Sequence, residues 1–112
     1  FLDIAGGLVV SETDTISGNG SGTDAVSLST VMTFLDTSSG TSQLTMGAGT
    51  VGQIKIITMT VAGNAATMTT SNGNLTPNIS TSIVWDAVGE TATFIYTGSK
   101  WAVMSRVDVT TS

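Results

Sequence analysis

Short runs of β-branched residues, separated by glycine, asparagine and serine, are the feature that most constrains how this chain folds. Residues 25–34 alternate, with Val26, Met32 and Phe34 in one phase, and this period of two is typical of a half-buried strand. Residues 53–61, QIKIITMTV, form the strongest run. Because Val, Ile and Thr are stiff at χ1 and favour extended structure, the chain is predicted to be all-β with negligible helix.

Turn residues divide the remainder of the chain into further short strands. These strands are expected at residues 43–46, 65–70, 82–86, 91–97 and 100–107. Residues 62–64 are expected to join residues 53–61 and 65–70 as a hairpin, and the last third is expected to form a meander around the Gly98-Ser99 turn. About seven to nine short strands at this spacing predict an antiparallel β-sandwich or barrel.

The first 24 residues are rich in Gly and Ser, and residues 1–24 are therefore expected to form an extended N-terminal arm on a domain of residues 25–112. Several residues of this arm are too apolar for a solvated tail. We expect them to dock on a neighbouring chain, with a passive, frayed terminus as the alternative. The candidate docking residues are Phe1, Leu2, Ile4, Leu8, Val9 and Val10.

The chain contains no histidine and no cysteine, and its net charge is -5. Without imidazole it lacks the usual general base and the commonest metal ligand, and without thiols it has no cysteine nucleophile, zinc–thiolate site or disulfide. Its three cations, Lys55, Lys100 and Arg106, are too few and too scattered to bind a nucleic acid backbone, and no apolar run is long enough to span a membrane. The composition predicts a protein that is not an enzyme, with no cofactor, no metal, no nucleic acid and no membrane partner.

Charged residues make up only 10% of the chain, against about 25% in ordinary soluble domains. With no disulfide to stabilise so small a domain, we expect oligomerisation, most simply as a homotrimer. The strand at residues 53–61 is apolar on both faces, so one face is expected to meet a subunit; burial of both faces within a monomer is the alternative. The candidate oligomer interface consists of Ile54, Ile56, Ile57, Met59, Phe94, Tyr96, Trp101 and Met104.

Two pairs of acidic residues are candidate sites. Asp86 and Glu90 flank a Gly turn, where acids are usually solvated turn-formers rather than the carboxylate pair of a glycosidase. Glu12 and Asp14 would share one face of a strand and could contribute to a Ca²⁺ site, but the EF-hand spacing is missing. Neither pair is predicted to be catalytic or to bind a metal.

The lysines and tryptophans also have simple structural interpretations. Lys55 and Lys100 could in principle activate a serine nucleophile, but both are expected to be exposed, solubilising charges. Trp85 and Trp101 could stack on sugars if they were exposed. They are expected instead to anchor the sandwich core or a subunit interface.

Two stretches, GTVGQIKIITM at residues 49–59 and WDAVGETATFIYTGSKW at residues 85–101, resemble a β-rich module of tailed-phage virion proteins. In such modules a Gly-x-x-Gly-Gln-x-Lys strand precedes a Thr-rich hairpin, and the chain closes on Tyr-Thr-Gly-x-x-Trp. The resemblance covers roughly residues 43–104 and carries no catalytic residue.

The resemblance implies a virion structural protein. The leading expectation is a capsid decoration (cement) protein that binds the major capsid protein on the capsid exterior as a trimer and stabilises the shell. The alternative is a receptor- or glycan-binding module of a tail fibre or spike, with Trp85 or Trp101 at an exposed tip.

Overall fold

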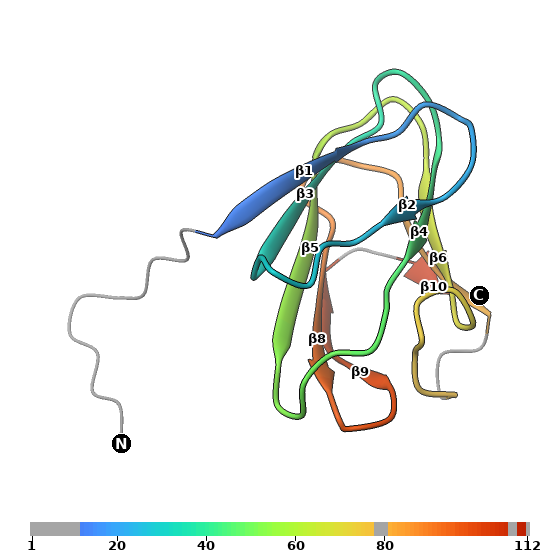
Figure 1. Cartoon of the computed structure of the whole chain (residues 1–112). Coiled ribbons are helices and arrows are strands. Elements are labelled where there is room, and N and C mark those ends of the chain that lie inside the picture. Colours follow the sequence, from blue (N-terminus) through green and yellow to red (C-terminus); the bar gives the residue numbers. More distant parts are fainter. Residues whose placement is uncertain (1–11, 78–80, 108–109, 112) are drawn as a thin grey trace.

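The computed structural model describes residues 12–77, 81–107 and 110–111, and these residues form two packed β-sheets and no helix (Figure 1). The first sheet has the order β1 (Thr13–Ser17), β3 (Met32–Asp36), β5 (Ile54–Val61), β8 (Thr91–Tyr96) and β9 (Trp101–Val107). The second has the order β10 (Thr110–Thr111), β7 (Ser82–Trp85), β6 (Ala66–Thr69), β4 (Ser42–Thr45) and β2 (Asp24–Ala25). The predicted all-β sandwich is confirmed. None of the described residues belongs to a helix that could cross a membrane.

From β1 to β6 the chain alternates between the two sheets at every connection. As a result β1, β3 and β5 are parallel in the first sheet, and β2, β4 and β6 are parallel in the second. Parallel neighbours need a long crossover connection, and here each crossover contains a strand of the opposite sheet. The prediction of purely antiparallel pairing is therefore wrong for this part of the chain.

The hairpin predicted between residues 53–61 and 65–70 is also wrong, because β5 and β6 lie in different sheets. The turn between them is held against the end of β3. Thr37 Oγ1 donates to the carbonyl oxygen of Asn64 at 2.6 Å, and Asn64 Nδ2 donates to the carbonyl oxygen of Thr37 at 2.9 Å. These contacts carry the chain across the sandwich instead of back along β5.

The predicted meander is correct only for β8 and β9, which form a hairpin closed by a 2.9 Å hydrogen bond from the Thr97 amide to the Lys100 carbonyl. β7 pairs with β6 in the second sheet, so the chain changes sheets again before β8. The long strand predicted over residues 25–34 is interrupted, since β3 begins only at Met32. In the segment before β3, backbone carbonyls accept hydrogen bonds from side chains. Gln53 Nε2 donates to the Leu28 carbonyl, and Lys55 Nζ donates to the Thr30 carbonyl.

The described part of the expected arm belongs to the sandwich, because β1 and β2 are strands of the two sheets. Just after β1 the chain crosses another segment closely. The Gly18 amide donates to the Asp36 carbonyl at 2.9 Å, and a Cβ on Gly18 would lie 2.6 Å from the Gly40 oxygen. The boundary predicted at residue 24 is therefore not seen, and all six docking residues, between Phe1 and Val10, lie outside the described residues.

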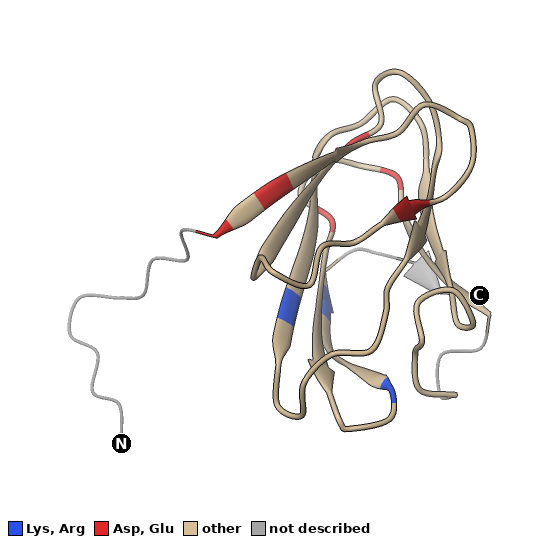
Figure 2. Ribbon diagram, viewed as in Figure 1, with Lys and Arg blue, Asp and Glu red and all other residues tan. Residues whose placement is uncertain are grey.

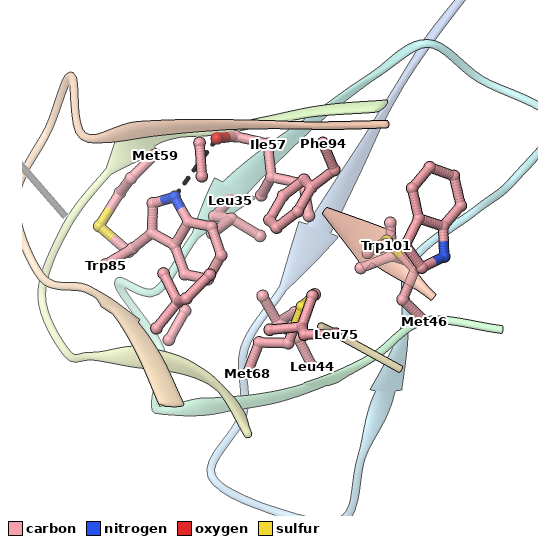
Figure 3. Packing of buried hydrophobic residues seen from close by; sticks show 14 of the residues in the cluster. Leu35, Leu44, Met46, Ile57, Met59, Met68, Leu75, Trp85, Phe94 and Trp101 are labelled. Atoms are coloured by element: carbon pink, nitrogen blue, oxygen red, sulfur yellow. Dashed lines mark hydrogen bonds between the residues drawn. The ribbon is translucent and has the colours of Figure 1, made fainter. Parts of the chain in front are cut away.

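The core between the sheets is built around the aromatic residues Trp85, Phe94 and Trp101, which have no exposed surface (Figure 3). Trp85 Nε1 donates to the Ile57 carbonyl at 3.3 Å, and Trp101 Nε1 donates to the Gly47 carbonyl at 2.8 Å. Gly49 packs so closely on the Trp101 ring that a Cβ there would lie 2.7 Å from Cζ2. Both tryptophans are thus core anchors, and neither can stack on a sugar at the surface.

Candidate functional site

Five of the eight residues predicted to form an oligomer interface belong to the core instead. Their exposed fractions are at most 6% because they face the second sheet; they are Ile57, Met59, Phe94, Tyr96 and Trp101. The other three lie outside the core. Ile54 on β5 is 42% exposed, Ile56 is partly exposed, and Met104 on the edge strand β9 is 54% exposed. Only these three remain available to a partner.

The side of the first sheet that faces away from the core carries a continuous group of apolar side chains, here called the outer face. Its members alternate along their strands with buried residues; they are Met32, Phe34, Ile54, Ile56, Ile95 and Ala102. The strand register places them side by side, since Met32 pairs with Ile56 while Ile95 pairs with both Ile54 and Ala102. The outer face therefore extends across four adjacent strands.

Charged residues do not interrupt the outer face. On the strands that form it, charged residues are few (Figure 2): Asp36 and Arg106 lie near strand ends, and the Lys55 side chain is fully buried. The remaining outward positions of β5 and β8 carry threonines, of which Thr58 and Thr91 are joined by a 2.6 Å hydrogen bond between their hydroxyls. A sheet with one solvated face normally alternates between apolar and polar residues, whereas contiguous apolar surface of this kind marks interaction sites.

Lys55 has no exposed surface, so its predicted exposure is wrong. Its Nζ donates to the carbonyl oxygen of Thr30 at 2.9 Å and to Thr30 Oγ1 at 2.8 Å, and lies 3.8 Å from Asp14 Oδ1. The same Asp14 oxygen accepts hydrogen bonds from Thr30 Oγ1 at 2.6 Å and from Thr33 Oγ1 at 2.7 Å. These four residues, Asp14, Thr30, Thr33 and Lys55, are called the lysine network.

Burial lowers the pKa of the Lys55 amine, and the negative charge of Asp14 opposes this shift. Asp14 is engaged with Lys55 and two threonines, whereas Glu12 is exposed. Among the described residues no three His, Cys, Asp or Glu side chains are grouped as metal ligands. The carboxylate of Asp14 is thus part of an internal ion pair that ties β1 to β5.

Asp86 is exposed, as predicted, but Glu90 is only 6% exposed, so the prediction that Glu90 is a solvated turn-former is wrong. Glu90 Oε1 accepts hydrogen bonds from the backbone amides of Asp86 at 2.5 Å and Ala87 at 2.9 Å. Burial raises the pKa of Glu90. The hydrogen bonds from these amides and from the Asp86 side chain together lower it by more, so the pKa of Glu90 lies below its usual value. The hydrogen bond to Glu90 and its negative charge raise the pKa of Asp86. The pair stabilises the turn between β7 and β8.

Lys100 is exposed, as predicted, and its Nζ donates to Asn74 Oδ1 at 2.9 Å. The lysine network and the burial of Glu90 were missed by the sequence analysis. A signal for the network was present, since Lys55 is in phase with Ile57 and Met59 along one strand.

A comparison with protein-family models finds no match for this chain, and no curated protein matches its sequence. The resemblance of residues 49–59 and 85–101 to tailed-phage virion modules therefore stays a prediction.

Proposed function

We propose that this protein is a non-catalytic structural component of a virion, a capsid decoration (cement) protein that binds the major capsid protein on the capsid exterior as a homotrimer. The observation that carries the proposal is the outer face, an uncharged apolar surface spread over β3, β5, β8 and β9. It suits an assembly role because its affinity comes from apolar area removed from water, and no reacting group is needed.

The outer face is held on a rigid support. Every second residue is buried along β3 and β8 and along β5 as far as Met59, so the intervening outward side chains are fixed in register. Aromatic and methionine side chains such as Phe34 and Met32 are enriched at protein interfaces. We assign this surface to contacts between sister copies, and symmetry then adds many modest contacts on one particle.

The resemblance to tailed-phage modules supports the virion assignment. Its two stretches contain residues 54–59 of β5 and the whole of β8, and these two strands are neighbours in the first sheet. The resemblance therefore falls on one continuous part of the sheet that carries the outer face.

The alternative, a glycan-binding module of a tail fibre, depended on Trp85 or Trp101 at an exposed tip. Both side chains are fully buried, and their indole nitrogens donate to backbone carbonyls inside the sandwich. No observation on the described residues favours this alternative over the decoration role.

The proposal is tested by counting this protein on purified virions of the virus that encodes it, by quantitative mass spectrometry against the major capsid protein. A decoration protein is expected at a copy number comparable with that of the capsid protein, and washing it off should lower the temperature at which the shell opens. A few copies per particle, or none, would contradict the proposal.

A further inference from the structure

β1 is bound to the first sheet in the way an added peptide strand is bound. It lies at the sheet edge, pairs with β3 alone among the described strands, and runs parallel to it from Thr13 opposite Met32 to Ser17 opposite Asp36 (Figure 1). None of its side chains is fully buried, and only Asp14 and Ile16 are partly so. Main-chain hydrogen bonds combined with alternate side chains in pockets are the mode of β-strand addition.

The lysine network selects the register of β1. Among the described residues only Asp14 brings a carboxylate to the buried ammonium of Lys55, and both neighbours of Asp14 on β1 are threonines. A slip by one residue would replace the carboxylate with a threonine and leave the ammonium without its opposite charge. Removing one partner of such a pair is strongly unfavourable. The edge of β3 together with Thr30, Thr33 and Lys55 therefore forms a specific acceptor for this strand, here called the strand acceptor.

The connection from β1 to β2 contains a suitable hinge. Gly20 and Gly22 have φ angles of 78° and 67°, which favour glycine. A Cβ on Gly22 would meet nothing within 4 Å, and one on Gly20 would meet only Thr41 Oγ1 at 3.9 Å. Gly18, by contrast, fits tightly against Gly40. The Gly20 amide donates to the Thr41 carbonyl at 2.9 Å, so an exchanged strand has to make this bond again in the acceptor copy, and the change of chain direction falls on the exposed residues 21–23.

We propose that the strand acceptor of one copy receives residues 12–19 of a second copy, so that sister subunits exchange their first strands. The exchanged strand would make the same contacts that β1 makes within one chain. The exchanged and unexchanged forms therefore differ in free energy only through the hinge conformation and the association of the two copies. Thr13 and Thr15 of β1 pair with Met32 and Phe34 of the outer face, so the donor strand borders the surface assigned to sister copies. This inference rests on the proposed oligomer, which raises the local concentration of the donor strand.

The test uses the full chain, which contains no native cysteine. Thr13→Cys is introduced in one copy and Met32→Cys in another, because these residues pair in adjacent strands and Thr13 is exposed. The two proteins are mixed unfolded, refolded together and oxidised, and the mixed disulfide is identified by peptide mass spectrometry. Thr67→Cys and Val84→Cys in separate copies are the matched control, since β6 and β7 pair at these residues in the second sheet, away from the outer face.

Strand exchange predicts a disulfide between chains in the mixture of Thr13→Cys and Met32→Cys, and none between chains in the control mixture. A double variant carrying both Thr13→Cys and Met32→Cys should then form covalent oligomers. If it forms only disulfides within one chain while wild-type protein is oligomeric by light scattering, strand exchange is wrong and the decoration role stands. If wild-type protein is also monomeric and absent from virions, both proposals are wrong.

Discussion

The carboxylate of Asp14 on β1 lies 3.8 Å from the ammonium of Lys55 on β5, although β3 runs between these two strands. The lysine side chain spans the inward side of β3, where Thr33 also donates to Asp14. The ion pair and the Thr33 hydrogen bond together therefore link three parallel strands that no hairpin joins. Since the Lys55 side chain has no exposed surface and that of Asp14 is 29% exposed, solvent screens the pair only from one side.

Asp14→Asn is expected to lower the free energy of unfolding by about 2 kcal/mol, less than for a fully buried pair because Asp14 is partly exposed. The loss comes from leaving the Lys55 ammonium buried without its counter-charge. Adding Lys55→Met to Asp14→Asn should restore most of the stability, since an apolar side chain of similar length suits the core. Urea denaturation measures both effects. Glu12→Gln, at an exposed acid, is the control and should change stability by less than about 0.5 kcal/mol.

Stability is expected to rise with pH in the alkaline range. The pKa of Lys55 is lowered in the folded protein, whereas in the unfolded chain it is about 10.4. Between these two values the unfolded state holds the proton and the folded state has released it, so the free energy of unfolding increases with pH. Urea denaturation at increasing pH up to about 10.4, the pKa of lysine in the unfolded chain, should show this slope, and Lys55→Met should lack it. Equal slopes in the two proteins would show that Lys55 is not the cause.

Glu90→Ala should lower the free energy of unfolding by about 1–3 kcal/mol, because the amides of Asp86 and Ala87 lose their acceptor. Glu90→Gln keeps a carbonyl acceptor and should lose less. The pKa of Glu90 is lowered on folding, so the advantage of wild type over Glu90→Gln should be complete above about pH 4.3 and disappear as the pH falls through the lowered pKa. Asp86→Asn is the control: it relieves repulsion with Glu90 and should cause no loss at neutral pH.

Ile54→Lys should weaken self-association by about tenfold or more, because it places a charge in the outer face. The fold should be unaffected, since Ile54 is 42% exposed in the single chain. Light scattering over a range of concentrations measures association, and thermal unfolding at high dilution checks the fold. Val88→Lys is the matched control, because Val88 is 65% exposed in the turn between β7 and β8. If the two variants associate equally strongly, the outer face is not part of the interface.

The positions of the strands could be predicted from the sequence because alternation and turn residues are local signals. The expected strands at residues 53–61, 91–97 and 100–107 differ from β5, β8 and β9 by one residue at an end. Strand direction could not be predicted in this way. The turn at residues 62–64 reverses the chain, but only its distant contacts with Thr37 determine that the chain crosses to the other sheet.

Which side chains lie in the core and which at the surface could also be predicted only in part. Ile56 and Ile57 are equally apolar, so the sequence of β5 alone does not say which of its faces meets the second sheet. Lys55 could have been placed correctly from its phase with Ile57 and Met59, but its charge suggested exposure. What makes its burial possible is Asp14, a residue far away in the sequence, which no local pattern connects to it.

The alternation of β1 to β6 between the sheets also determines how the chain is buried while it is being made. As the protein leaves the ribosome, β1 emerges first, but β3 and Lys55 follow only after the chain has passed through the second sheet. Neighbours in each parallel ladder are therefore always synthesised apart, and such distant pairings form slowly. Asp14 on β1 also has no opposite charge until Lys55 has been made, and during that interval the first strand is accessible to other nascent copies of the chain.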